Sequence, residues 1–213
     1  MYRECNVLFL GLCEYREAYS YQRQLLCKRI GNKIPDTLVL VYHPSVITIG
    51  CAGETGGKLV SPTEVGQESI AVYKNHLLGN IFYHGPGQLV CYPILDIKGH
   101  GKDPELVVKK YCEVMVRVMG GYGLSGLLVK GPGVWYRDEM IGFADINVTG
   151  GVTFYGFALN ININMDNFKY ITQKGSRFTS LQKILGRRLD EDEVKNSVIS
   201  HFGEVFTLKM VLK

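Results

Sequence analysis

The sequence predicts an α+β fold in which helices flank a mixed β-sheet. Runs rich in β-branched and aromatic residues recur along most of the chain, whereas helical periodicity is confined to a few segments. Clustered strands with few helices are typical of this class. A chain of 213 residues can bury a sizeable core, so we expect one domain over residues 1–213.

The first half of the chain predicts one helix among several strands. Apolar residues at helical spacing predict a helix over 15–30, which Gly31 and Asn32 would end. The runs that predict strands lie, in chain order, at residues 6–12, 37–43, 46–50, 68–74, 80–84 and 88–97.

A second helix opens with clear start signals. Asp103 is a good N-cap, Pro104 suits the first helical position, and Glu105 makes the first turn acidic. We expect this helix to run to about Met119, where a pair of glycines would end it.

The second half returns to strands before two final helices. Its β-rich runs lie at residues 127–131, 133–138, 140–148 and 152–164, and a last short strand is expected at 204–210. A short helix is expected at 180–185. A longer one is expected at 190–202, where Asp190 and Glu193 form a variant of the capping box.

Composition excludes some functional classes. Hydrophobic residues make up 46% and charged residues 21%, as in ordinary soluble globular proteins. The net charge of +4, without a Lys/Arg block, is too mild for a dedicated nucleic-acid binder and would suit a weakly acidic protein partner. No apolar run approaches the roughly 20 residues of a membrane span.

The cysteines and histidines do not predict a metal site. None of the six cysteines forms a CxxC pair, and the five histidines are dispersed, so we expect no zinc site. The sequence has no Walker motif either, and we expect no cofactor. The N-terminus does not resemble a secretory signal, so we expect reduced thiols and a cytoplasmic protein.

The stretch YHGPGQLV at 83–90 is unusual within a strand pair. Gly85 and Gly87 permit backbone conformations closed to other residues and let a ligand approach closely. His84 and Gln88 can hydrogen-bond a ligand at such a bend. Taken alone, the stretch would be a hairpin turn with a buried histidine.

The chain resembles the lipoyl (octanoyl) transferase family over most of its length. Five stretches carry the resemblance, in the family's order: HPSVITIG at 43–50, NIFYHGPGQLVCYPILDI at 80–97, GPGVWYRD at 131–138, YGFALNININ at 155–164 and ITQKG at 171–175. The resemblance implies the fold of the biotin/lipoate protein ligase catalytic domain. It implies transfer of an octanoyl group from acyl carrier protein to a lysine of the lipoyl domains of 2-oxoacid dehydrogenases or glycine cleavage H protein, without ATP.

The residues that the family's chemistry needs are replaced. Lys174 stands where the family has its nucleophilic cysteine, and Met140 stands where it has the lysine that lowers the thiol pKa. An acylated lysine is an amide, a far poorer acyl donor than a thioester, so Lys174 cannot replace the cysteine. Cys51 and Cys91 lie near the expected cleft, but free cysteine is commonly buried as an apolar residue, and we favour that interpretation for both.

Other family positions also differ. Leu77 replaces an arginine, Leu78 and Asp145 replace glycines, and Tyr155 replaces a histidine. Leu77 and Leu78 would make the tunnel entrance more apolar, adding about 1.5–3 kcal/mol per fully buried side chain for an aliphatic ligand.

The resemblance implies one acyl tunnel. The residues expected to bind substrate there are Leu77, Leu78, Gly79, Asn80, Ile81, Phe82, Tyr83, His84, Gly85, Gly87, Gln88, Phe143, Ala144, Asp145, Gly156, Phe157 and Ala158. The alternating Asn160, Asn162 and Asn164 share one strand face and would either line a polar cleft or face water.

Several functional hypotheses remain open. In the first, the target lysine attacks the thioester directly, and Lys174 donates a hydrogen bond to the developing oxyanion. Lys174 could equally be a solvated loop lysine. In the second, the protein is an inactive relative that binds an acyl or lipoyl group, a carrier, or a true transferase as a second subunit. An ATP-dependent lipoate ligase relative is the weakest, because such ligases also use the lysine replaced by Met140.

Overall fold

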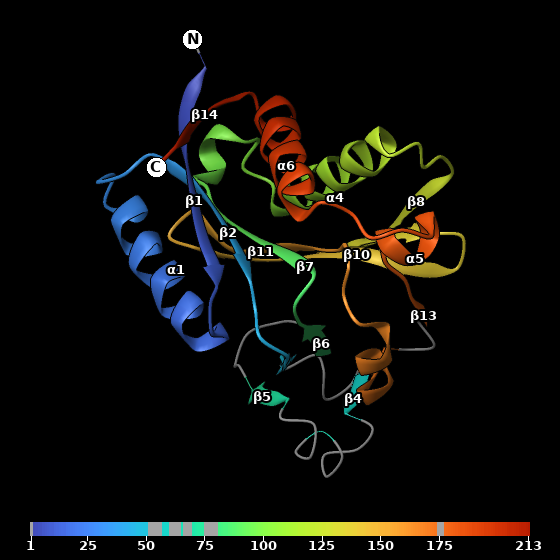
Figure 1. Ribbon diagram of the computed structural model, residues 1–213. Coiled ribbons are helices and arrows are strands. Elements are labelled where there is room, and N and C mark those ends of the chain that lie inside the picture. Colours follow the sequence, from blue (N-terminus) through green and yellow to red (C-terminus); the bar gives the residue numbers. More distant parts are fainter. Residues whose placement is uncertain (1, 51–56, 60–64, 66–69, 75–80, 174–176) are drawn as a thin grey trace.

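The computed structural model describes residues 2–50, 57–59, 65, 70–74, 81–173 and 177–213. Its largest layer is a sheet of nine described strands (Figure 1). In sheet order these are β14 (Leu208–Leu212), β1 (Arg3–Leu12), β2 (Asp36–Tyr42), β7 (Gln88–Ile94), β11 (Val152–Asn160), β10 (Glu139–Thr149), β9 (Gly133–Tyr136) and β8 (Leu127–Lys130), with β13 (Arg177–Phe178) paired to β10.

The sheet is mixed, as expected. Strand β1 runs parallel to both β14 and β2, and β13 runs parallel to β10. The pairs from β2 through β7, β11, β10 and β9 to β8 are antiparallel. The predicted α+β class with a mixed sheet is therefore confirmed.

Two small sheets lie beyond one end of the large sheet (Figure 1). One has the order β5 (Ala71–Lys74), β3 (Val46–Ile49) and β6 (Ile81–His84). The other pairs β12 (Ile171–Gln173) with β4 (Gly57–Leu59). The chain returns directly from β6 to β7 in the large sheet, so the turn between them joins the two layers.

Helices cover both faces of the large sheet (Figure 1). Helix α1 (Tyr15–Ile30) packs on one face, and α4 (Pro104–Gly121) and α6 (Glu191–Phe206) pack on the other. The shorter helices are α5 (Leu181–Leu185), η1 (Ile97–Gly99) and η2 (Met165–Tyr170). Start signals match expectation: an Asp103 carboxylate oxygen accepts from the Glu105 N–H, and Asp190 accepts from the N–H groups of Asp192 and Glu193.

Strand β2 has apolar side chains on both faces, which is why helices must cover both faces of the sheet. Its side chains alternate between faces, as a strand requires. Leu38 and Leu40 belong to the apolar core under α4 and α6, and Val39 and Val41 belong to the core under α1. All four are buried, so neither face of the strand is left to water.

The expected strand at 204–210 is wrong in its first half. Glu204–Phe206 close α6, and the strand β14 begins only at Leu208. The aromatic and β-branched residues there suggested a strand, but Phe206 packs in the core and stacks on Phe202, one helical turn earlier. Thr207, at a φ of 55°, ends the helix and reverses the chain.

Other boundaries also differ from expectation. The strand expected at 88–97 ends at Ile94, and Ile97 begins η1. Helix α4 continues through its pair of glycines and ends at Gly121, with Tyr122 as C-cap. Strand β11 ends at Asn160 instead of continuing to 164. The next two backbone N–H groups, of Ile161 and Asn162, both donate to the carbonyl of Gly87.

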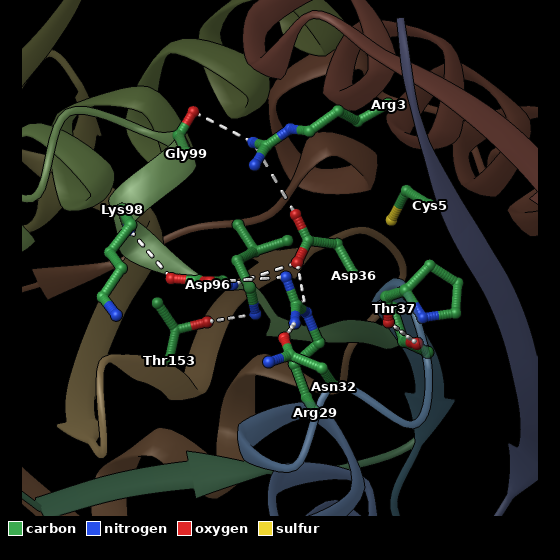
Figure 2. Close-up of polar contacts among 12 residues, drawn as sticks. Arg3, Cys5, Arg29, Asn32, Asp36, Thr37, Asp96, Lys98, Gly99 and Thr153 are labelled. Carbon is green, nitrogen blue, oxygen red and sulfur yellow. Dashed lines mark hydrogen bonds and ion pairs between the residues drawn. The ribbon is translucent and has the colours of Figure 1, made fainter.

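A buried ionic cluster holds the end of β2 that lies away from the small sheets (Figure 2). The Asp36 carboxylate accepts from Arg29 Nε at 2.8 Å, from His100 Nε2 at 2.9 Å and from the Asp96 N–H at 3.0 Å. Arg3 approaches the same carboxylate at 3.9 Å. The cluster ties the end of α1, the start of β1 and the segment after β7 to the first residue of β2.

Candidate functional site

A pocket opens on the α1 side of the large sheet, where the small sheet β5–β3–β6 meets it. Residues from α1, β3, β6, β7, β10 and β11 contribute to its walls. The residues that line it are Tyr15, Thr48, Gly50, Phe82, His84, Val90, Tyr92, Phe143, Asp145, Tyr155, Gly156, Phe157 and Ala158. Most are apolar or aromatic, and a few polar groups converge among them, which is typical of a small-molecule site.

Aromatic rings make the pocket narrow. Phe82 from the small sheet and Phe143 from the large sheet stack face to face, with ring centroids 4.1 Å apart and an angle of 3° between the ring planes. The Tyr15 ring lies nearly parallel to the His84 ring, with ring centroids 6.3 Å apart. Flat apolar walls of this kind suit a slender ligand with methylene groups.

A chain of hydrogen bonds fixes the orientation of His84. Asn160 Nδ2 donates to the Thr179 carbonyl at 2.9 Å, so Asn160 Oδ1 must accept, and Gln88 Nε2 donates to it at 2.8 Å. The same Gln88 nitrogen donates to the Tyr83 carbonyl. Gln88 Oε1 therefore accepts from His84 Nδ1 at 2.7 Å, which leaves Nε2 of this neutral ring as a hydrogen-bond acceptor.

Both histidines at the site are neutral at physiological pH. Burial, with a smaller contribution from the nearby His43, lowers the pKa of His84 to about 3. Burial lowers the pKa of His43 to about 4. The His43 ring bridges the Cys13 carbonyl, at 2.7 Å, and the Tyr92 hydroxyl, at 2.8 Å, so it holds Tyr92 in the pocket wall.

The glycines of the 83–90 stretch are explained by close packing. Gly87 has a φ of 84°, and a Cβ added there would lie 2.6 Å from the Asn162 carbonyl carbon. A Cβ on Gly85 would clash with the Tyr83 hydroxyl oxygen. The turn is therefore locked against the segment after β11, and this holds His84 and Gln88 in place.

Asp145 is the one carboxylate among the described residues of the pocket wall. Burial raises the pKa of Asp145 to about 7, and the Ile146 N–H lowers it only in part. Within the part of the chain that the structure describes, no side chain forms an ion pair or hydrogen bond with this carboxyl group. It stands directly opposite Gly156 in the β10–β11 register.

Tyr155 lies beside Asp145 in an uncommon backbone conformation. Its φ is 66°, which a bulky residue rarely adopts within a strand. Its N–H donates to the buried Gln22 side chain of α1 at 3.3 Å. The Tyr155 hydroxyl is buried and has no hydrogen-bond partner of good geometry among the described residues.

The structure brings seven of the expected substrate-binding residues to the pocket wall. These are Phe82, His84, Phe143, Asp145, Gly156, Phe157 and Ala158. Others lie next to the wall without contributing to it: Ile81, Tyr83, Gly85, Gly87, Gln88 and Ala144. Leu77, Leu78, Gly79, Asn80 and Lys174 lie outside the described residues.

Met140 does not line the pocket in the described structure. It is buried in the apolar core under α1, and its strand position pairs with Phe178. The thioether therefore fills core space at the position where the family pattern has a lysine.

Six residues of the wall are outside the set expected to bind substrate: Tyr15, Thr48, Gly50, Val90, Tyr92 and Tyr155. Tyr15 begins α1, and only the packing of this helix against β7 and β11 brings it there. The alternation of Val90 and Tyr92 on one face of β7 was visible in the sequence, but the identity of that face was not.

No thiol lines the pocket among the described residues. Cys91 points into the core under α4 and α6, and burial raises the pKa of its thiol well above the ordinary value. The interpretation of Cys91 as a small apolar core residue agrees with this placement. Cys51 lies outside the described residues.

Residues 14–203 match the lipoyl protein ligase A/B catalytic domain. The chain is 37% identical to the octanoyltransferase of Caldicellulosiruptor saccharolyticus over 210 residues, covering 96% of this chain and 89% of that one. It is 38% identical to the octanoyltransferase of Chloroflexus aurantiacus over 214 residues, covering 97% and 96%. The chain belongs to the octanoyltransferase family. The resemblance drawn from the five sequence stretches is thus confirmed.

Solved structures of related ligases share the fold of this octanoyltransferase family member. A bi-partite lipoate protein ligase from Thermoplasma acidophilum superposes with a TM-score of 0.74 at 15% identity, covering 99% of this chain and 87% of that one. Lipoate-protein ligase A bound with ATP gives 0.71 at 15% identity, covering 100% and 89%. The biotin protein ligase of Aquifex aeolicus gives 0.56 at 13% identity, covering 97% and 70%. The expected biotin/lipoate protein ligase fold is confirmed.

A membrane-spanning helix is not found in the described part of the chain, where no helix is both long and apolar enough.

Proposed function

We propose that this protein transfers an octanoyl group from acyl carrier protein to a lysine of a lipoyl domain, as a cytoplasmic enzyme of protein lipoylation. The observation that carries the proposal is the identity of 36–38% to octanoyltransferases over 92–97% of the chain. The family's motif positions at Phe82, His84 and 156–158 also meet in one aromatic pocket. The natural acceptors would be lipoyl domains of 2-oxoacid dehydrogenases or glycine cleavage H protein.

The transfer is proposed to be direct. The described pocket wall carries no thiol, and an octanoylated Lys174 would be an unreactive amide. The neutral lysine amine of the acceptor would attack the thioester carbonyl and form the C–N bond, and collapse of the resulting tetrahedral oxyanion would break the C–S bond. The carrier thiolate leaves and takes up one proton, and the second proton lost by the acceptor ammonium passes to a base or to water. Positioning of the two substrates supplies most of the acceleration.

Two side chains are proposed to assist this step. Lys174 would donate a hydrogen bond to the carbonyl oxygen as it becomes an oxyanion. His84 would accept a hydrogen bond at Nε2, the nitrogen that its contact with Gln88 leaves free to accept. Met140 would take no part in the chemistry, because its side chain is buried in the apolar core.

An inactive relative is the second candidate function. It is favoured by the loss of both the cysteine and the lysine of the family pattern at Lys174 and Met140. Such a protein would bind an acyl or lipoyl group without turnover, or serve as the partner subunit of an active transferase.

Intact-protein mass spectrometry separates the two candidates. The purified protein is mixed with octanoyl acyl carrier protein and an apo lipoyl domain. Direct transfer predicts an octanoyl adduct on the lipoyl domain above a control without the protein, and no adduct on the protein itself. Binding of the octanoyl carrier with an unmodified lipoyl domain would instead support the inactive relative.

The Lys174→Ala variant tests the oxyanion role. Loss of one such donor lowers the rate by about 10²–10³ in comparable enzymes. Lys209→Ala is the matched control, because this exposed lysine pairs with Glu4 on β1, away from the pocket. Equal transfer rates for the two variants would remove Lys174 from the mechanism.

A further inference from the structure

The charge of the pocket is the reverse of what the family pattern predicts. That pattern places a lysine at position 140 and a histidine at position 155, whereas this chain has methionine and tyrosine there. Among the described lining residues there is one carboxylate, Asp145, and no lysine or arginine. The pocket histidine, His84, is neutral because burial holds its pKa near 3. The described wall therefore carries negative charge only.

Five aromatic rings line the same pocket as this carboxylate: those of Tyr15, Phe82, Tyr92, Phe143 and Tyr155. The face of an aromatic ring attracts a cation through its quadrupole, and a flat ring also packs against methylene groups. A pocket with aromatic walls and a single acid is suited to a cation on an alkyl chain.

Two polar groups in the pocket are incompletely paired within the described structure. The Tyr155 hydroxyl is buried, and the Tyr15 side chain approaches it without forming a hydrogen bond of good geometry. Asp145 meets a backbone N–H and no side chain that could neutralise it, as far as the described residues extend. A plain alkyl chain would leave both groups unsatisfied, whereas a hydrogen-bond donor with positive charge would satisfy both.

The backbone of Tyr155 is strained in this arrangement, and its surroundings hold it there. A φ of 66° is unfavourable for tyrosine, and the N–H bond to Gln22 of α1 helps to hold it. Strain of this kind persists where the surrounding packing imposes it, and here it places the phenol beside the carboxylate.

We propose that Asp145 and Tyr155 form a binding site for an alkylammonium group. The ammonium would lie against the Asp145 carboxylate and donate to the Tyr155 oxygen, and its methylenes would lie between the aromatic rings. The group could come from either of two sources. One is the side chain of the acceptor lysine, a reading that rests on the proposed transfer. The other is an amine at the end of the bound acyl chain.

The site requires the ionised form of Asp145. Because the pKa of the free carboxyl group is about 7, most of it is charged at pH 8 and little of it at pH 6. The other titratable groups that face it are Tyr15 from α1, His84 from β6, Tyr92 from β7 and Tyr155 from β11, with His43 behind His84. Burial lowers the pKa of His43 and His84 to about 4 and 3 and raises those of Tyr92 and Tyr155 above their ordinary value.

Calorimetric titration of the full chain with n-butylammonium chloride, in phosphate buffer at constant ionic strength, tests the site. At pH 8 we expect binding that Asp145→Asn weakens at least tenfold and Tyr155→Phe weakens several-fold. We expect the wild-type affinity to fall about tenfold between pH 8 and pH 6. Neutral n-butanol should bind wild type and Asp145→Asn equally.

Asp138→Asn is the matched control, because it removes the same charge from an exposed aspartate in the turn before β10. It should leave butylammonium binding unchanged. Circular dichroism and thermal melts establish that each variant is folded. No butylammonium binding at pH 8, or equal binding by wild type and Asp145→Asn, would overturn the proposal.

Competition distinguishes the two sources. Nα-acetyl-lysine methylamide represents the acceptor side chain, and 8-aminooctanamide represents an acyl chain that ends in an amine. The compound that displaces butylammonium at the lower concentration identifies the source, and displacement by neither would overturn the site. These measurements need no carrier protein and no transfer, so octanoyl transfer can fail while the ammonium site stands, and the reverse also holds.

Discussion

At the scale of single residues, Asp145 shows how burial brings the pKa of a carboxyl group close to neutral pH. It lies on the wall of an aromatic pocket with one backbone N–H to stabilise its charge among the described residues. The fold therefore opposes its ionisation. Tyr155 beside it has a buried hydroxyl and a left-handed backbone, so two costly features occupy neighbouring positions of paired strands.

Asp145→Asn should stabilise the protein above neutral pH. The pKa of this carboxyl group is about 7 in the folded protein and 3.8 in the unfolded chain, so the folded state holds the proton more tightly. The stability that protonation contributes is present below pH 3.8 and is lost as the pH rises through 7. Urea unfolding at pH 8 should show the variant more stable by roughly 1–3 kcal/mol, after allowance for solvent screening.

That advantage should shrink as the pH is lowered toward 5, where wild-type Asp145 is also neutral. A constant difference between pH 8 and pH 5 would show that the carboxyl group is not desolvated in the folded protein.

At the scale of elements, the turn from β6 to β7 joins the small sheet to the large one. Its carbonyl at Gly87 accepts from the first two N–H groups after β11, at 3.0 Å and 2.8 Å. The hydrogen-bond chain from Thr179 through Asn160 to Gln88 ends at His84 in the same turn. The turn therefore fixes the positions of the strand ends and the orientation of His84, which lines the pocket.

Gly87→Ala should destabilise this junction. The added Cβ would lie 2.6 Å from backbone of residue 162 and would occupy a φ of 84°. We expect a loss of about 2–4 kcal/mol in urea unfolding, because overpacking and backbone strain add.

Gly186→Ala is the control for strain alone. Gly186 has a φ of 69°, and nothing lies within 4 Å of the Cβ that would be added. Its loss should be only about 1 kcal/mol. Equal losses for the two variants would mean that the close contact at Gly87 relaxes freely.

At the scale of the whole molecule, the Asp36 cluster lies at the end of β2 that is away from the small sheets (Figures 1 and 2). The pocket is built where the small sheets meet the large one. The cluster joins α1, β1 and the segment after β7 at the far end, through Arg29, Arg3 and Asp96. Burial by itself would raise the pKa of Asp36, but hydrogen bonds from His100, the Asp96 N–H and Arg29 hold it below its usual value.

Asp36→Asn should therefore destabilise the whole fold at pH 7. Removing one partner of a buried ionic cluster leaves Arg29 without its counter-charge, which typically costs about 3–5 kcal/mol. Because the folded pKa of Asp36 is lowered, the contribution of the carboxylate is present above pH 3.8 and is lost as the pH falls through the folded pKa.

The exposed Asp138–Arg177 pair provides the comparison. Asp138→Asn should change the free energy of unfolding by less than about 0.5 kcal/mol, since both side chains are well exposed. A similarly small effect of Asp36→Asn would show that the buried cluster does not stabilise the fold.

The sequence by itself determined the features that depend on near neighbours in the chain. The bounds of α1 at 15–30 and the caps at Asp103 and Asp190 follow from local spacing and hydrogen-bonding chemistry. Family membership follows from the order of five motifs. The wrong prediction of a strand at 204–210 also has a local cause, because aromatic and β-branched residues suit both a strand and a buried helix face.

Only the tertiary structure decided what faces the pocket. Tyr15 reaches it because α1 packs across β7 and β11, whereas Met140 packs in the apolar core under α1 and does not line the pocket. The pairing of β10 with β11 sets Asp145 opposite Gly156, the residue that follows Tyr155. These contacts join residues far apart in the chain, and their energies depend on burial and desolvation, which no local pattern of residues encodes.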